Sequence, residues 1–119
     1  APADYRLEKP FDNKVKSDTL TLTFVKNPDI AKTLGESKGE RKLVVFSAET
    51  ENLIENAKGK LKKKHADLVV ANDVTQKGAG FNVDTNVATI IDNDGNLFDS
   101  GEVSKRALAD MILDKVLAL

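Results

Sequence analysis

The fold is decided by the stretch KLVVFSAETENLIENAKGKLKKKHADLVVAND, residues 42–73. It begins with the continuous apolar, β-branched run KLVVF (42–46) and closes with a second such run, DLVVAN (67–72). Runs of this kind are typical of strands that are covered on both faces. Between them, residues 49–65 carry acidic side chains early and lysines late, the order that the helix dipole favours. The stretch therefore predicts a strand–helix–strand unit with parallel strands and a right-handed crossover.

Two further elements are predicted upstream of this unit. TLTLTFV (19–25) alternates strictly, which predicts a strand with one buried face formed by Leu20, Leu22 and Phe24. KNPDIAKTLG (26–35) predicts a short helix, because Asn27 is a good N-cap and Gly35 can close the last turn.

Downstream, VATII (87–91) and NLFD (96–99) flank the turn sequence DNDG and predict a β-hairpin. A final helix begins near Ser104 as N-cap, with an apolar stripe at helical spacing formed by Ala107, Leu108, Met111, Ile112 and Val116. Together these elements predict an α/β chain: a Rossmann-like three-layer fragment with a mainly parallel sheet, a βαβ unit and a C-terminal hairpin plus helix.

Composition narrows the chemistry. A chain of 119 residues suits a single domain with one modest core, and its formal net charge of −1 gives no reason to expect nucleic acid or an anionic membrane as partner. No apolar run reaches the length of a membrane span. The absence of cysteine excludes disulfides, thiolate metal sites and thiol nucleophiles, and it suits a reducing cytoplasm. Because the chain does not begin with Met, we expect it to be a piece of a longer protein.

Five lysines cluster in KGKLKKKH, residues 58–65. At about 100° per residue, Lys58, Lys62 and Lys63 fall on the outer face of the predicted helix. The buried arc is formed by Leu53, Ile54, Ala57 and Leu61; Lys64 falls within it, between Leu53 and Ala57, and Lys60 falls at its edge. Two interpretations follow: both side chains reach past the core to water, or both project toward an anion site at the edge of the sheet.

In open α/β sheets, ligands bind beyond the carboxyl ends of the parallel strands. Three stretches would converge there: FSAET (46–50), NDVTQKGAGF (72–81) and the helix start KNPDI (26–30). GAG (78–80) is a weak phosphate-loop signal, and Asn72 and Asp73 suit either ligand contacts or turn formation.

Classical catalytic sets are missing. His65 is the only histidine and stands at a predicted helix end, where it suits capping of the last carbonyl groups. No GxSxG nucleophile motif occurs, and histidine or cysteine metal cages are excluded. Carboxylates acting together with substrate phosphates could still hold a divalent cation.

Several motifs, in this order, resemble the C-terminal part of the phosphopantothenate–cysteine ligase domain of the DNA/pantothenate metabolism flavoprotein family. They are ADYR (3–6), KVK (14–16), FVKNPDI (24–30), FSAETENLIENAKGKLKKKHADLVVANDV (46–74) and GAGFNVDTN (78–86). The resemblance covers nearly the whole chain, and VANDV followed by GAGF and DTN is specific as a combination.

The resemblance implies an activity in coenzyme A biosynthesis. The family activates the carboxylate of 4′-phosphopantothenate with CTP and Mg²⁺ as an acyl-cytidylate, and cysteine then forms the amide. In bacteria the ligase is usually fused to an FMN-dependent decarboxylase, and it acts as a cytoplasmic homodimer.

The resemblance also implies roles for individual residues. Lys14 would hold the triphosphate and stabilise charge as pyrophosphate leaves, and Asp4 would contact nucleotide, substrate or Mg²⁺. The remaining expected nucleotide contacts are Pro28, Asp29, Ile30, Ala31, Phe46, Lys60 and Lys64. Weaker substrate contacts are expected at Ala3, Asp4 and Asn72.

Two features depart from the family pattern. Val45 and Ser47 flank Phe46, where the family usually has Gly and Ala. The family's upstream half, with its glycine-rich segment and SNxSSG-type stretch, is absent, so residues 1–119 are expected to be the C-terminal part of the ligase domain and inactive alone. The alternative is a non-catalytic nucleotide-binding or dimerisation module. The joint presence of Lys14, Lys60 and Lys64 favours the enzyme.

Overall fold

The computed structural model describes residues 2–75 and 83–119, so GAG (78–80) lies outside the described part of the chain. The chain divides into two compact units, Ala1–Ile30 and Ala31–Leu119. Each unit is described by itself.

The first unit is built around two short antiparallel strands, β1 (Tyr5–Leu7) and β2 (Phe24–Lys26). The predicted strand over 19–25 is therefore largely wrong, since only its last residues pair with β1. The buried face predicted for it is wrong as well: Leu20, Leu22 and Phe24 are 52%, 40% and 57% exposed. Alternation predicts the side on which an apolar residue lies, but burial needs a second layer, and two short strands do not supply one.

Asn27 belongs to this first unit rather than to a helix cap. Its Nδ2 donates to the carbonyl oxygen of Ala3 at 2.7 Å, and its backbone N–H donates to that of Asp4 at 2.8 Å. The helix that follows, α1 (Ile30–Glu36), begins three residues later, so the predicted N-cap at Asn27 is wrong. The residue ties the end of β2 to the segment before β1.

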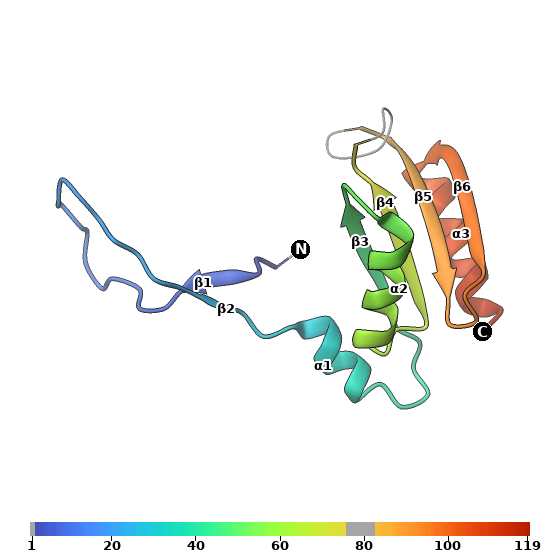
Figure 1. Ribbon diagram of the computed structural model, residues 1–119, viewed down its shortest axis with the longest axis horizontal. Coiled ribbons are helices and arrows are strands. Elements are labelled where there is room, and N and C mark those ends of the chain that lie inside the picture. Colours follow the sequence, from blue (N-terminus) through green and yellow to red (C-terminus); the bar gives the residue numbers. More distant parts are fainter. Residues whose placement is uncertain (1, 76–82) are drawn as a thin grey trace. The chain divides into compact units, whose positions relative to one another are not determined.

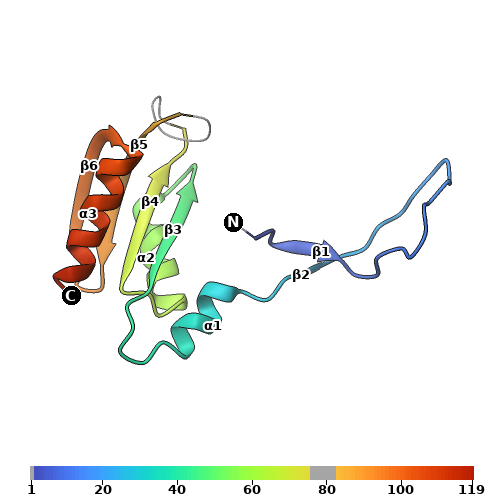
Figure 2. The same cartoon turned by 180° about the vertical axis from the view of Figure 1, so that it is seen from behind.

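The second unit has three layers around a four-stranded sheet in the order β3-β4-β5-β6 (Figure 1). Its strands are β3 (Val44–Glu49), β4 (Leu68–Asp73), β5 (Thr85–Asp92) and β6 (Leu97–Ser104). The helices α2 (Leu53–Lys63) and α3 (Lys105–Leu117) lie on opposite faces, as the view from behind also shows (Figure 2). None of the helices in the described ranges is long and apolar enough to cross a bilayer.

The α/β class, the βαβ unit and the C-terminal hairpin plus helix are confirmed. β3 and β4 pair in parallel and are joined through α2, whereas β4–β5 and β5–β6 are antiparallel. The expected mainly parallel sheet is thus met only at the β3–β4 pair of the described strands. β5 and β6 form the predicted hairpin, and antiparallel pairing is what so short a connection allows.

Two apolar clusters hold the layers together, one on each face of the sheet. Under α2 lie Val45, Ala57, Leu61, Ala66, Val69, Ala71 and Ile91. Under α3 lie Leu68, Val70, Ala88, Ile90, Leu108 and Ile112. Successive residues of β4 alternate between the two clusters, as the pleat of a strand covered on both faces requires.

The boundaries of α2 differ from the predicted 49–65. Glu49 still pairs with Asp73 as the last residue of β3, and Asn52 adopts a left-handed conformation with φ of 48° just before the helix. At the other end, His65 has φ of 50°, and its backbone N–H donates to the carbonyl oxygen of Lys62 at 3.2 Å. Asn and His are among the side chains that tolerate this conformation. His65 therefore ends the helix through its backbone geometry.

The last helix starts as predicted. The hydroxyl of Ser104 accepts a hydrogen bond from the backbone N–H of Ala107 at 3.1 Å, which is an N-cap interaction. Leu108 and Ile112 are buried from the predicted apolar stripe, and Met111 and Val116 pack beside them.

At the amino end of the β3–β4 pair, the carboxylate of Asp67 links two segments through hydrogen bonds. Asp67 Oδ2 accepts a hydrogen bond from the backbone N–H of Leu43 at 2.7 Å and from Lys38 Nζ at 2.6 Å. Burial opposes ionisation of Asp67, but the hydrogen bonds from Lys38 and Leu43 outweigh it and hold the pKa of this carboxyl below its usual value. The carboxylate joins the chain before β3 to the first residues of β4.

Replacing Asp67 with Asn should lower the free energy of unfolding at pH 7 by about 1–2 kcal/mol, because a charge-assisted hydrogen bond is lost. A carboxyl with a depressed folded-state pKa stabilises the fold above its unfolded pKa and loses that effect as pH falls through the folded pKa. The difference between Asp67→Asn and wild type should therefore shrink in acid, as urea unfolding at pH 7 and in acid would show. Asp110→Asn is the control: its contact with Arg106 is exposed, so stability should change by less than about 0.5 kcal/mol.

Candidate functional site

The carboxyl end of β3 carries a buried serine in contact with a lysine of α2. Ser47 is fully buried and lies on the same face of the strand as Val45, under the helix. Its Oγ accepts a hydrogen bond from Lys60 Nζ at 2.8 Å and donates one to the carboxylate of Glu49. Lys60 Nζ also lies 2.5 Å from Glu49 Oε1. The three side chains form a closed, charge-neutral triangle.

Glu49 is held from a further side. Asn56, in the first turns of α2, donates from Nδ2 to Glu49 Oε2 at 3.1 Å and to the carbonyl oxygen of Glu51 at 2.9 Å. The hydrogen bond from Lys60, followed by that from Ser47, lowers the pKa of Glu49 below its usual value. The carboxylate is therefore ionised at neutral pH. With 13% of its side chain exposed, it has little freedom to move.

The helical wheel predicted the burial of the lysines correctly. Lys60 and Lys64 are half-buried, while Lys58, Lys62 and Lys63 are exposed. Lys60 reaches the carboxyl end of β3 through the contacts above. Lys64 stands one helical turn, about 6 Å, farther along the axis. Since α2 runs antiparallel to β3 and β4, that step leads away from the carboxyl ends of the strands.

The backbone of Lys64 is in close contact with α1. Lys64 follows the last residue of α2, and its N–H donates to the carbonyl oxygen of Lys60 at 3.0 Å. Gly35 of α1 lies so near that a Cβ built on it would be 1.8 Å from the Lys64 carbonyl oxygen. Gly35 was predicted to close α1, but it lies inside the helix, and its lack of a side chain serves this close approach.

Phe46 lies at the same end of β3 but on the other face. Its neighbour Ser47 points toward α2, so by strand alternation the Phe46 ring points to the opposite side. Phe46 is 62% exposed. Because β3 is the outer strand in the order β3-β4-β5-β6, the edge between the two faces is open within the described sheet.

At the end of β4, Asn72 and Asp73 have structural partners. Asn72 Oδ1 accepts a hydrogen bond from Asn86 Nδ2 of β5 at 2.9 Å. Asp73 Oδ1 accepts from the backbone N–H of Thr75 at 3.0 Å and from its hydroxyl at 2.6 Å. Of the two roles open to Asp73 from the sequence, the turn-forming one is present.

The remaining predicted residues lie in or next to the first unit. Ala3, Asp4 and Lys14 are exposed there, as are Pro28, Asp29 and Ile30. Ala31, which opens the second unit, packs partly against the cluster under α2. Over residues 2–75 and 83–119, no three His, Cys, Asp or Glu side chains gather in a way that could hold a metal ion. A Mg²⁺ at Asp4 would therefore depend on phosphate oxygens for its other ligands.

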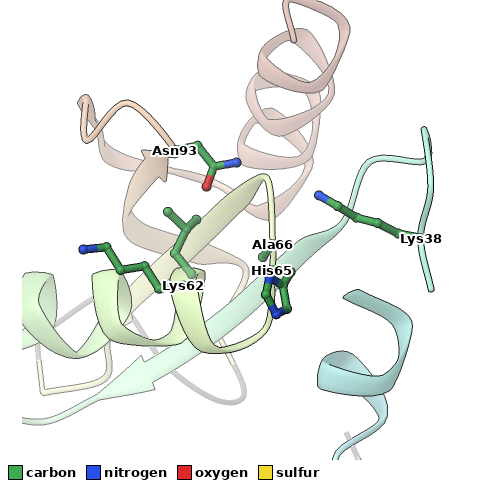
Figure 3. A pocket seen from close by; sticks show the side chains of 6 residues that line it. Lys38, Lys62, His65, Ala66 and Asn93 are labelled. Atoms are coloured by element: carbon green, nitrogen blue, oxygen red, sulfur yellow. The ribbon is translucent and has the colours of Figure 1, made fainter. Parts of the chain in front are cut away.

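A cavity of about 410 Å³ lies at the opposite end of the sheet (Figure 3). It is lined by Lys38, Leu61, Lys62, His65, Ala66 and Asn93. Ala66 precedes β4 and Asn93 follows β5, which places the cavity at the amino ends of β3 and β4. None of the predicted site residues lines it. The ammonium of Lys38 is already bound to Asp67, so the cavity is no match for the nucleotide site expected at the carboxyl ends.

Ser47, Glu49 and Asn56 were not predicted as site residues. The signal for Ser47 was present: continuing the alternation of KLVVF puts residue 47 on the face that α2 covers, and a buried hydroxyl needs a partner. Glu49 was assigned to the helix, which hid its place at the end of β3.

The second unit is a three-layer α/β domain with polar side chains at the carboxyl end of its parallel strands, the end at which ligands generally bind in open α/β sheets. The chain is a member of one family of such domains: its residues 1–119 match the DNA/pantothenate metabolism flavoprotein C-terminal domain.

Known relatives agree with this membership. The chain is 42% identical over 121 residues to the coenzyme A biosynthesis bifunctional protein CoaBC of Bacillus subtilis, with 100% of the chain and 30% of the relative covered. For the protein of the same name from Escherichia coli K12, identity is 39% over 122 residues, covering 98% and 30%. The crystal structure of the C-terminal domain of a CoaBC protein superimposes with a TM-score of 0.74 at 32% identity, covering 98% of this chain and 49% of that one. The chain thus spans about a third of the length of these curated relatives.

Replacing Gly35 with Ala should lower the free energy of unfolding by about 1–3 kcal/mol, because the new Cβ would overlap the Lys64 carbonyl and push the two helices apart. Gly59→Ala is the matched control: Gly59 lies within α2, and a Cβ there meets nothing within 4 Å. This control should raise stability by about 0.5–1 kcal/mol. Thermal or urea unfolding of both variants would test the pair, and equal effects would contradict the close contact.

Proposed function

We propose that the chain is the nucleotide-handling part of a CTP-dependent ligase of coenzyme A biosynthesis. The enzyme would activate 4′-phosphopantothenate as an acyl-cytidylate and then join it to cysteine. Family membership and the similarity to CoaBC proteins support the pathway. Because the chain spans 30% of those relatives, the complete reaction would belong to a longer protein in which residues 1–119 are the C-terminal part of the ligase domain. An FMN-dependent decarboxylase half would lie outside these residues.

The observation that carries the proposal is the position of Lys60. Its ammonium is half-buried at the carboxyl end of β3, the edge where open α/β sheets bind ligands. A cation at this place suits a polyphosphate better than a neutral ligand, because phosphate oxygens accept strong charge-assisted hydrogen bonds. Lys64 stands one turn farther along α2, away from that end of the sheet, so the phosphate chain would have to run back along the helix to contact it.

The open edge of β3 suggests how a nucleotide would lie. Phe46 and Lys60 stand on opposite faces at the same end of the outer strand, so a ligand that contacts both would cross that edge. The phosphates would lie on the α2 side and the apolar part against Phe46. Pro28, Asp29, Ile30 and Ala31 would read cytosine through backbone groups.

The chemistry would proceed in two displacements. A substrate carboxylate oxygen attacks the α-phosphorus of CTP, the P–O bond to pyrophosphate breaks, and the cysteine amine later displaces CMP to give the amide. Lys14 would stabilise the charge that develops on the leaving pyrophosphate, a role that counts in the transition state. Asp4 would orient the nucleotide or hold one ligand position of its Mg²⁺, which would neutralise phosphate charge. Ala3 and Asn72 would border the substrate.

Lys14→Gln in the full-length product of the gene should slow CTP-dependent pyrophosphate release by at least about tenfold, because one charge-assisted contact to the leaving group is lost. The melting temperature should not change, since Lys14 is exposed. Lys16→Gln, an equally exposed lysine two residues away, is the control and should keep wild-type turnover. Normal turnover in Lys14→Gln would exclude the catalytic role.

A titration of the 119-residue chain with CTP and then ATP, in Mg²⁺, followed by two-dimensional amide NMR, tests where the nucleotide binds. Shifts should centre on residues 29–31, Phe46, Lys60 and Lys64 and be larger with CTP. Nucleotide binding by a full-length protein that never forms pyrophosphate would favour the alternative, a non-catalytic nucleotide-binding or dimerisation module. Sedimentation of the full-length protein would test the proposed homodimer.

A further inference from the structure

We propose that Glu49, acting with Ser47, is a positioning residue for Lys60: it holds the ammonium at the carboxyl end of β3 with one N–H left to donate to a phosphate oxygen. The inference rests on the proposed function, because it concerns how Lys60 would meet a nucleotide. Neither Glu49 nor Ser47 is among the site residues that the family resemblance implies.

The first step is a count of donors. A lysine ammonium has three N–H groups. In Lys60, two of them donate, to Ser47 Oγ at 2.8 Å and to Glu49 Oε1 at 2.5 Å. The part of the chain that the structure describes supplies no acceptor for the third. With 38% of its side chain exposed, Lys60 can present that donor to a ligand from the solvent side.

The second step is the rigidity of the acceptors. Ser47 lies in the interior of β3 and is fully buried, so its hydroxyl has little room to move away from Lys60 and Glu49. Glu49 accepts from Ser47 and Lys60 on one oxygen and from Asn56 on the other. Strand β3 and helix α2 therefore both contribute to one fixed cradle for the ammonium.

The third step is the balance between two opposing effects of Glu49. Its charge cancels that of Lys60 and weakens the long-range attraction for an anion. Its hydrogen bond orders a flexible side chain before the ligand arrives, so that binding does not have to pay for that ordering. Because the ligand would approach a partly exposed ammonium, water screens the repulsion from the carboxylate on the far side. We therefore expect ordering to outweigh repulsion.

A double-mutant cycle in the full-length product of the gene, with CTP affinity measured by calorimetry, tests the inference. Lys60→Ala should weaken CTP binding by about tenfold, and Glu49→Gln by about threefold to tenfold. In the Lys60→Ala background, Glu49→Gln should have no further effect, because Glu49 acts through the ammonium. Ser47→Ala, which changes the buried volume little, should also weaken CTP binding. This variant tests the inference if Glu49→Gln does not fold. Glu55→Gln, an exposed glutamate of the same helix, is the control and should bind like wild type.

The outcomes separate the two proposals. If Lys60→Ala weakens binding but Glu49→Gln and Ser47→Ala bind as tightly as wild type or tighter, the nucleotide role of Lys60 stands and the positioning role is overturned. An equal effect of Glu49→Gln with and without Lys60 would also overturn it, since Glu49 would then act on its own. If Lys60→Ala binds CTP like wild type, the proposed function of Lys60 fails, and the positioning role fails with it.

Discussion

Burial of β4 on both of its faces is the constraint on which the second unit depends. Leu68, Val69, Val70 and Ala71 are at most 1% exposed, and they alternate between the cluster under α2 and the cluster under α3. A strand of this kind needs a helix on each side and a partner along each edge. The crossover through α2 supplies one helix and the partner β3, and the hairpin with α3 supplies the rest. The same arrangement brings the carboxyl ends of β3 and β4 together, and with them the polar side chains of the site.

Much of this unit could be predicted from the sequence, because its strands and helices have strong, matching patterns. The continuous apolar runs at 42–46 and 67–72 identified the two parallel strands, and the wheel separated Lys60 and Lys64 from the three exposed lysines. Parallel pairing could be predicted only where a crossover helix joins two strands. The hairpin turn predicts the antiparallel β5–β6 pair, whereas no sequence signal predicted that β5 would pair antiparallel to β4.

Elsewhere, local patterns were insufficient. The alternation of residues 19–25 is real, but nothing in that segment states whether a second layer covers it, and in the described unit its apolar side is exposed. Asn27 satisfies the chemistry of a helix cap, yet it bonds across the first unit to Ala3, a contact between residues 24 positions apart. The cradle of Ser47, Glu49 and Asn56 was missed for a related reason: the end of β3 was assigned to the helix, and a boundary error of a few residues moved the carboxylate to the wrong element.

The contact between Gly35 and the carbonyl of Lys64 fixes the distance between α1 and the end of α2. A side chain at position 35 would overlap the Lys64 carbonyl group, so the separation between α1 and the end of α2 is set mainly by main-chain atoms. Main-chain contacts vary less than contacts between flexible side chains, which can adapt by changing rotamer. A ligand reaching from Ala31 to Lys64 would thus meet a span of constant length. Selection would then act on the distance between the two recognised groups of the ligand, and molecules too short or too long would be rejected even with the right charge.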